Sequence, residues 1–226
     1  MLALVYDVHG NLPALDAVLE DAAAEADRYL LGGDYALFGA WPRETIARLR
    51  ELPADWIRGN AERWTADPEE APDQVQGAIS ACREMIGDEL VGELAALPET
   101  LERDGILYCH GSPVSDVRSF FPEPGEDEGE LLAGVEARRL VFGHTHLAFA
   151  RTAANGIELV NPGSVGMPFD GDHRAAYALV RDDGAVEHRR VPYDYAASAR
   201  AVRERLGEAG EVPARRIEQA RMDVED

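Results

Sequence analysis

Short apolar runs and amphipathic segments alternate along the first sixty residues. The run Leu2 to Tyr6 predicts a buried strand, and residues 12–22 carry apolar side chains at helical spacing. The same order then repeats, with strands expected at 28–31 and 55–58 and a helix between them over 43–52. Each repeat has about the length of a βαβ unit, roughly 30 residues, so the three strands are expected to be parallel.

A polar residue follows each of these strands, namely Asp7, Asp34 and Asn60. In open α/β sheets the carboxyl ends of parallel strands line the crevice that binds ligands. The three side chains are therefore expected to lie close together, although an aspartate near a helix start also serves as a cap.

The second half of the chain predicts further strands and a second sheet. Residues 105–109 and 139–142 are apolar runs that lead into His110 and into the pair His144 and His146. Further strands are expected at 157–160, 175–180 and 186–191, and the last two should form an antiparallel hairpin. Helices are expected at 77–97 and 193–206, and loops at 66–76 and 122–130, of which the second is a candidate lid. The charged tail beyond Gly207 is expected to form a last helix or to be partly disordered. No repeat or linker interrupts the chain, so one domain is expected over 1–226.

The composition limits the classes of partner. Aspartate and glutamate number 43 against 22 lysines and arginines, which leaves a net charge of −21. Such a chain repels a phosphate backbone and an anionic membrane surface, so neither duplex nucleic acid nor a membrane is expected as a partner. Cys82 and Cys109 are too few for a disulfide framework and fit a reducing, cytoplasmic compartment.

Four of the six histidines stand in or beside the polar strand ends, which marks this edge as a candidate metal site. Imidazole, carboxylate and amide groups together suit first-row transition metals such as manganese, iron or zinc. Seven donors are too many for one tetrahedral ion, but two ions about 3.5–4 Å apart that share a carboxylate would use all of them. The candidates are Asp7, His9, Asp34, Asn60, His110, His144 and His146.

Five short motifs contain these donors and occur in a fixed order: Asp7-Val8-His9-Gly10-Asn11, Gly33-Asp34, Gly59-Asn60-Ala61-Glu62, His110-Gly111 and Gly143-His144-Thr145-His146. Together they resemble the signature of the calcineurin-like metallophosphoesterases, over roughly residues 1–180. The stretch from Asn161 to Gly166 is similar to one in the small bacterial and archaeal phosphodiesterases of that superfamily. The resemblance implies an α/β fold in which two mixed β-sheets pack as a sandwich flanked by α-helices, a four-layer αββα arrangement.

The resemblance also implies how the donors divide between two divalent metal ions. One ion would be bound by Asp7, His9 and His146, and the other by Asn60, His110 and His144. Asp34 would bridge the two and, as the catalytic residue, hold the nucleophilic hydroxide that attacks phosphorus. The implied function is a metal-dependent phosphoric ester hydrolase that acts on a small phosphodiester or an activated phosphate ester.

Ala61 departs from the family pattern, in which many members carry a histidine after the Gly-Asn pair. A methyl group cannot protonate a leaving oxygen, and general acids contribute about 10²–10⁴-fold to such reactions. Esters with leaving groups of high pKa are therefore expected to be poor substrates. Three alternatives stay open: a phosphomonoesterase or a nucleotide pyrophosphatase on the same site, and a non-catalytic metal-binding interaction module on this fold.

Four residues near the motifs are candidates for substrate contacts, and each also has an ordinary structural interpretation. The candidates are Asn11, Tyr35, Glu62 and Arg174. Asn11 could instead be a helix N-cap, and Glu62 a surface carboxylate. Tyr35, with the other loop aromatics Phe38 and Trp41, could pack on the helix below. Arg174 could form a surface salt bridge.

Overall fold

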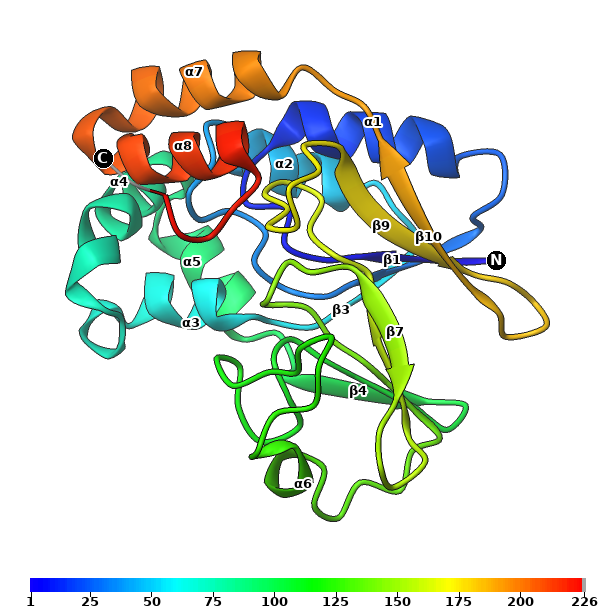
Figure 1. Ribbon diagram of the computed structural model, residues 1–226. Coiled ribbons are helices and arrows are strands. Elements are labelled where there is room, and N and C mark those ends of the chain that lie inside the picture. Colours follow the sequence, from blue (N-terminus) through cyan, green and yellow to red (C-terminus); the bar gives the residue numbers. More distant parts are fainter. Residues whose placement is uncertain (225–226) are drawn as a thin grey trace.

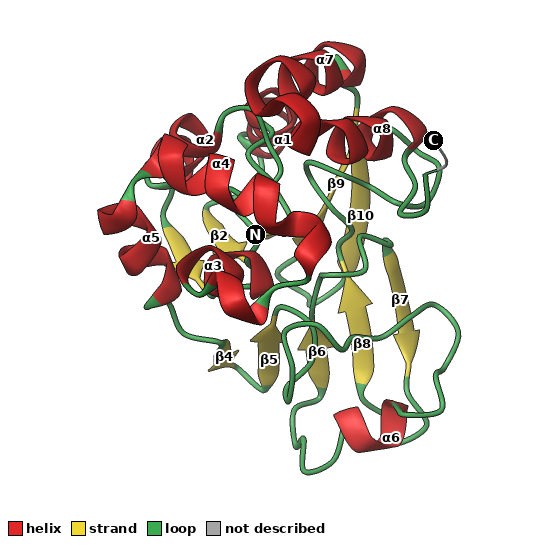
Figure 2. Ribbon diagram, turned by 90° about the vertical axis from the view of Figure 1, so that its left-hand side faces the viewer, coloured by secondary structure: helices red, strands yellow, loops and turns green. Residues whose placement is uncertain are grey.

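Two five-stranded sheets pack face to face in the computed structural model, which describes residues 1–224 (Figures 1 and 2). The first sheet has the order β10-β9-β1-β2-β3. Its strands are β1 (Leu2–Val5), β2 (Arg28–Leu31), β3 (Ala54–Trp56), β9 (Ala175–Val180) and β10 (Val186–Val191). The three N-terminal strands are parallel and β9 and β10 form an antiparallel hairpin, so both predictions from the sequence are confirmed.

The second sheet has the order β4-β5-β6-β8-β7, with β5, β6 and β8 parallel. Its strands are β4 (Thr100–Arg103), β5 (Ile106–Cys109), β6 (Arg139–Val141), β7 (Phe149–Thr152) and β8 (Glu158–Asn161). The sequence pattern predicts the three inner strands but misses β4 and β7. These two lie at the sheet edges, where most of their side chains are partly or fully exposed, so no apolar run marks them.

Alternation along the strands divides the core into layers, as β1 illustrates. Ala3 and Val5 face the helices on the outside of the first sheet, whereas Leu4 and Tyr6 face the second sheet. The cluster between the sheets combines residues of both: Leu4, Tyr6, Leu30, Ile57, Ile106, Tyr108, Val141, Val160 and Ala178. Because the inner faces of the two sheets share this cluster, the sheets form the sandwich that the resemblance implies.

Helices cover the outer face of the first sheet and one end of the molecule (Figure 2). They are α1 (Leu12–Ala22), α2 (Pro42–Leu49), α3 (Asn60–Ala66), α4 (Gln76–Ile86), α5 (Asp88–Ala95), α7 (Tyr195–Leu206) and α8 (Glu211–Gln219). The outer face of the second sheet is covered more thinly, by the single-turn helix α6 (Glu128–Leu131) and the loops around it. The fourth layer of the sandwich is therefore mostly loop.

Several boundaries differ from the prediction for local reasons. The helix expected over 77–97 is two helices, because Gly87 between α4 and α5 has a φ of 81° that interrupts the helical backbone. The loop expected over 66–76 contains two short 3₁₀ helices, and the loop over 122–130 runs into α6. The tail beyond Gly207 forms α8, and its last two residues, 225–226, lie outside the described range. Within residues 1–224, no helix combines the length and the apolar character needed to cross a membrane.

Gly166 lets two segments approach behind the end of β1. Its backbone N–H donates to the Asp7 carbonyl oxygen at 3.0 Å, and a Cβ at this position would lie 1.9 Å from the Val8 carbonyl oxygen. We expect Gly166→Ala to lower the free energy of unfolding by about 1–3 kcal/mol, because the backbone must shift to relieve the overlap. Urea denaturation measures this change.

The matched control for this substitution is Gly92→Ala. Gly92 lies on the exposed side of α5, and a Cβ there meets no atom within 4 Å. Alanine is the better helix former, so Gly92→Ala is expected to raise the free energy of unfolding by roughly 0.5–1 kcal/mol. Equal unfolding midpoints for the two variants would contradict the packing argument.

Candidate metal centre

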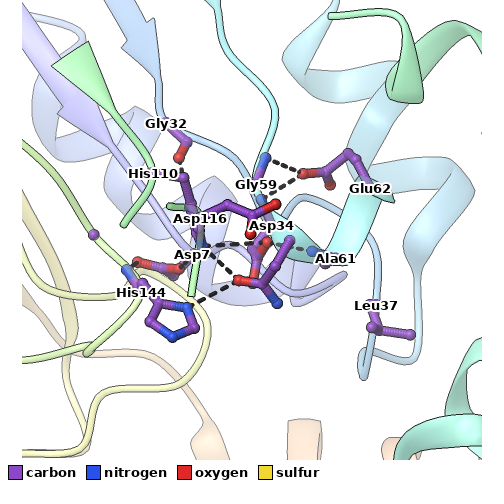
Figure 3. A network of polar contacts seen from close by, with 12 residues as sticks. Asp7, Gly32, Asp34, Leu37, Gly59, Ala61, Glu62, His110, Asp116 and His144 are labelled. Atoms are coloured by element: carbon purple, nitrogen blue, oxygen red, sulfur yellow. Dashed lines mark hydrogen bonds and ion pairs between the residues drawn. The ribbon is translucent and has the colours of Figure 1, made fainter. Parts of the chain in front are cut away.

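The loops that follow β1, β2, β5 and β6 meet at one edge of the sandwich, because the parallel strands of both sheets end there. Asp7 follows β1, Asp34 follows β2, and His110 follows β5. Asn60 is the first residue of α3, and the loop after β6 carries His144 and His146. Figure 3 shows Asp7, Asp34, His110 and His144 converging from separate segments.

Backbone strain is concentrated in the same residues. Among residues 1–224, eight residues other than glycine have a positive φ, and five of them are candidate ligands: Asp7, His9, Asp34, His144 and His146. Such conformations cost free energy for side chains other than glycine, and they persist where the surrounding structure enforces them. Here the loops are held by backbone hydrogen bonds, such as the one from the His9 N–H to the Asp34 carbonyl oxygen at 2.9 Å.

One group of donors consists of Asp7, His9 and His146, which are all buried. The Nε2 atoms of His9 and His146 lie 3.1 Å apart, and His146 Nε2 lies 3.4 Å from Asp7 Oδ1. All three ligand atoms lie within 4.8 Å of one another. This spacing allows one ion to contact the three together.

A second group lies around His110. Its Nε2 is 3.4 Å from Asp34 Oδ1, 3.8 Å from Asp7 Oδ1 and 3.0 Å from the side-chain amide of Asn60. The same amide lies 2.9 Å from His144 Nδ1. Asp34 reaches both groups, because its other carboxylate oxygen lies 3.8 Å from His9 Nε2. The structure thus brings all seven sequence-predicted donors together.

The outer ring nitrogens of three histidines are occupied by backbone carbonyl groups. His9 Nδ1 contacts the Leu37 oxygen at 3.0 Å, His110 Nδ1 the Gly32 oxygen at 2.8 Å, and His146 Nδ1 the Met167 oxygen at 2.6 Å. A carbonyl accepts only from an N–H, so each Nδ1 carries a proton and donates it. The Nε2 lone pairs of these rings are therefore free to face the centre, as in histidines that bind metals.

These donors fit a divalent cation. Asp7 is fully buried, and its Oδ1 has no hydrogen-bond partner within the described chain. The Nε2 atoms of His9 and His146 face each other, and each carries a lone pair. These lone pairs repel each other unless a positive charge lies between them. A buried, unpaired carboxylate is costly to a folded protein, and a bound cation compensates it.

The pKa values of the histidines follow from burial and from the two carboxylates. Burial and a neighbouring histidine lower the pKa of His9 and of His144 to about 4, so both rings are neutral at pH 7 and able to ligate. Burial also disfavours the charged form of His110, but the nearby Asp34 and Asp7 outweigh it and raise its pKa to about 10. Without a metal ion, His110 therefore supplies the positive charge that the carboxylates require.

Glu62 supports the centre from behind. Its carboxylate accepts backbone N–H groups of Asp34 at 2.9 Å, Tyr35 at 2.9 Å and Gly59 at 2.7 Å (Figure 3). Burial, together with the charge of Asp34, raises the pKa of Glu62 to about 7. The expected substrate contact needs correction, since Glu62 is only 3% exposed and holds the loops after β2 and β3 together. Its position three residues after Gly59 at the start of α3 is a capping-box signal that could have indicated this role.

Two other expected substrate contacts also need correction because their side chains are buried away from the centre. Asn11 caps α1 and donates to the Gly166 carbonyl oxygen at 2.8 Å, so its amide is fully used within the fold. Tyr35 is completely buried, and its hydroxyl lies within hydrogen-bond distance of the carbonyl oxygens of Leu31 and Ile57. The alternative roles in capping and packing are the ones that the structure supports.

Arg174 likewise does not reach the centre. Its guanidinium pairs with the carboxylate of Asp172 two residues away, and both nitrogens involved lie within 3.1 Å of a carboxylate oxygen. The side chain is more than half exposed. This is the surface salt bridge that the sequence leaves open as the alternative.

A cavity of about 320 Å³ opens onto the donors, and we call it the inner cavity. It is bounded by five of the candidate ligands and by a largely apolar wall: His9, Asp34, Asn60, His144, His146, Phe38, Trp64, Pro72, Gln74, Val75, Met167, Phe169, Arg216 and Met222. Of the loop aromatics considered from the sequence, Phe38 lines this cavity. The sequence pattern did not indicate Trp64, Phe169 or Arg216, because no motif surrounds them.

Both the sequence and the structure of the chain are similar to those of known proteins. Residues 1–183 match the family model of the calcineurin-like phosphoesterase superfamily domain. An uncharacterized protein of Methanocaldococcus jannaschii is 28% identical in an alignment that covers 92% of this chain and 94% of that protein. Two solved structures are similar over nearly their whole length. A metallophosphoesterase from Sphaerobacter thermophilus has a TM-score of 0.80 at 26% identity, covering 97% of this chain and 98% of that one. A hypothetical protein from Pyrococcus horikoshii has a TM-score of 0.81 at 25% identity, covering 94% and 98%.

The contacts of Glu62 predict the effect of replacing its carboxylate. In Glu62→Gln one acceptor oxygen becomes an amide donor that faces a backbone N–H, so the free energy of unfolding should fall by about 1–3 kcal/mol. Because the loop carrying Asp34 loosens, metal affinity should fall by roughly 10–100-fold. Calorimetric metal titration and urea denaturation measure the two effects. The exposed Glu69 serves as the control, and Glu69→Gln should change neither quantity.

The raised pKa of His110 predicts proton release on metal binding. At pH 7.5 the metal-free protein holds a proton on this ring, and a cation that binds there must displace it, so at least about one proton should be released per protein. Titration with Zn²⁺ in buffers of different ionisation enthalpy measures the number released. His173 contacts the Glu218 carbonyl oxygen outside the centre, and His173→Gln should leave the number unchanged. A heat of binding independent of the buffer would contradict the displacement.

Proposed function

The chain belongs to the calcineurin-like phosphoesterase superfamily, and we propose on this basis that it is a metal-dependent hydrolase of small phosphate esters. The observation that carries the proposal is the convergence of seven donors, six of them buried, on the centre that contains the unpartnered carboxylate oxygen of Asp7. A cluster of this kind is costly to the fold, and it is useful only when it holds cations. The inner cavity gives a substrate access to the same donors.

We propose that the centre holds two divalent ions, of manganese, iron or zinc. One would lie among Asp7, His9 and His146, and the other among Asn60, His110 and His144. The contacts of Asp34 with His9 on one side and His110 on the other support its role as the bridge. When bound, such ions supply Lewis acidity toward phosphoryl oxygens and lower the pKa of a water molecule to near neutrality.

The residues of the chain supply orientation and exclusion of water. Carbonyl contacts hold the rings of His9, His110 and His146 so that their donor atoms stay aligned when the substrate enters. The apolar wall of the inner cavity lowers the local dielectric constant, which strengthens the attraction between the charged centre and a phosphate group. Together these effects favour attack on phosphorus at a prepared position.

The acidic surface supports a small substrate rather than a polymer. The net charge of −21 repels nucleic acid duplexes and anionic membranes, whereas a cationic centre attracts a small phosphate ester at close range. The arginines are largely neutralised by neighbouring carboxylates at the surface, as in the pairs Arg63–Asp116 and Arg203–Glu218. Both cysteines are free and buried, which suits the cytoplasmic location that we propose.

The test of this function compares two ester classes. Metal-stripped protein, re-supplied separately with Mn²⁺, Zn²⁺, Ni²⁺ or Mg²⁺, should hydrolyse bis-p-nitrophenyl phosphate faster than p-nitrophenyl phosphate. Removal of a side chain that hydrogen-bonds a metal ligand costs roughly 10–100-fold in activity. Asp34→Asn should lose more activity than that, because a neutral amide is a poor bridge between two cations. It should also bind less metal. Asp172→Asn, at the surface, is the matched control and should retain both.

Two outcomes of this test would favour an alternative function, and a third would contradict the two-ion assignment. Faster hydrolysis of the monoester would identify a phosphomonoesterase. Stoichiometric metal binding without turnover of either ester would support an interaction module. Wild-type activity and metal content in Asp34→Asn would overturn the two-ion assignment.

The environment of Ala61 predicts a dependence on the leaving group. Ala61 is 1% exposed and packs in the core beneath the first sheet, so its side chain offers no proton to a leaving oxygen. Across a series of substituted phenyl diesters, kcat/KM should fall steeply as the pKa of the leaving phenol rises. A rate that is independent of this pKa would show that another group protonates the leaving oxygen.

A further inference from the structure

A second cavity adjoins the inner one, and we call it the outer cavity. It has a volume of about 480 Å³ and lies between the loop 117–121, the loop that follows β6, and the C-terminal segment. The two cavities share three residues: His144, Phe169 and Met222. Because His144 is one of the donors, a phosphate group at the centre lies beside both cavities.

Phe169 and Met222 form the partition between them. The Phe169 ring stacks on the His146 ring with centroids 4.3 Å apart and an interplanar angle of 17°. The Arg216 guanidinium lies 5.9 Å from the Phe169 ring centroid, and its Nε donates to the Met222 carbonyl oxygen at 3.0 Å. The partition is therefore held by the centre on one side and by α8 on the other.

The C-terminal part of this partition lies beyond the matched family domain, which ends at residue 183. After α8 the chain turns at Ala220, whose φ is 50°, and runs back beneath the helix (Figure 1). The turn is anchored because the Ala220 carbonyl oxygen accepts the Gly171 N–H at 2.9 Å. Arg216 and Met222, which line the inner cavity, thus come from the C-terminal segment and not from the matched domain.

Both cavities are suited to apolar or aromatic groups. The described chain has five large apolar residues that are more than a third exposed, and three of them line the outer cavity: Val117, Phe121 and Met222. The inner cavity presents the rings of Phe38, Trp64 and Phe169. Exposed apolar side chains gathered beside a catalytic centre mark a binding surface, because elsewhere this protein's surface is strongly charged.

We infer that the substrate is a phosphodiester with two apolar or aromatic ester groups, which Phe169 and Met222 hold apart, one in each cavity. The inference rests on the proposed phosphoesterase function and specifies its substrate class. A monoester has one organic group and would leave one cavity empty. A diester fills both while its phosphate lies next to His144, the donor common to the two cavities.

Arg216 adds a cation to the inner cavity. In the described chain no carboxylate lies within salt-bridge distance of its guanidinium, and Asp223 acts on it only at longer range, although acidic residues outnumber basic ones almost two to one. A guanidinium placed over an aromatic ring can stack on a second planar group. The ester group in the inner cavity is therefore expected to be planar, such as an aryl group or a nucleobase.

The test uses two diesters that share a leaving group: p-nitrophenyl phenyl phosphate and methyl p-nitrophenyl phosphate. Wild-type protein should prefer the phenyl ester in kcat/KM by roughly tenfold or more, mainly through KM, because only the phenyl group fills the second cavity. Met222→Ala should reduce this preference at least severalfold. Met222→Leu, which keeps the side-chain volume, should restore it.

Val212→Ala is the matched control. Val212 lies on α8, is 41% exposed like the apolar residues of the outer cavity, and lines neither cavity. It should keep the wild-type preference. Hydrolysis of neither ester by the metal-loaded wild-type protein would overturn the proposed function and this inference with it. Equal kcat/KM for the two esters, or an unchanged preference in Met222→Ala, would overturn the inference alone and leave the phosphoesterase function standing.

Discussion

The buried carboxylate of Asp7 is the constraint on which the rest of this structure depends. It is fully enclosed, one of its oxygens has no hydrogen-bond partner in the described chain, and its nearest neighbours are histidine nitrogens and a second carboxylate. Leaving such a charge unpaired in a protein interior costs several kcal/mol. The nearby His110, whose pKa the two carboxylates raise, can supply a compensating positive charge, and a bound cation would supply another.

The surrounding contacts can be understood as the means of holding that charge in place. Strands from two different sheets end at the same edge, and the loops after them adopt left-handed conformations that bring the donors inward. Carbonyl groups fix the outer nitrogens of three histidines, and Glu62 binds the backbone of the loops after β2 and β3. Strain in the loops is thus balanced by hydrogen bonds on rigid elements, an arrangement typical of sites prepared for ligands.

The candidate ligands and part of the cavity walls come from different parts of the chain. All seven donors lie within the matched domain, whereas Arg216 and Met222 of the cavity walls lie in the C-terminal segment. α7 and α8 pack together on a cluster that includes Met167, next to the loop that carries Phe169. A change in this segment can therefore alter which organic groups fit without disturbing the donors.

The parallel strands and the candidate donors could be predicted from the amino-acid sequence, because both depend on local signals. Apolar runs mark strands that are buried on both faces, and a polar residue after each run identifies the edge where the ends of parallel strands meet. The exposed edge strands β4 and β7 lack that signal and were missed. Glu62 carried only the signal of a helix cap, and its second role with Asp34 depends on a loop 28 residues away.

Which side chains line the cavities beside the centre depends on long-range packing. Tyr35 and Phe38 lie three residues apart in one loop, yet the first is buried in the core and the second lines the inner cavity, because the loop turns between them. Phe169, Arg216 and Met222 come together through long-range packing of α8 against that edge, and no local pattern encodes such a contact. Periodicity and motifs report what a residue does within its own strand, helix or loop, whereas the walls of a cavity are formed by segments that meet only in the folded protein.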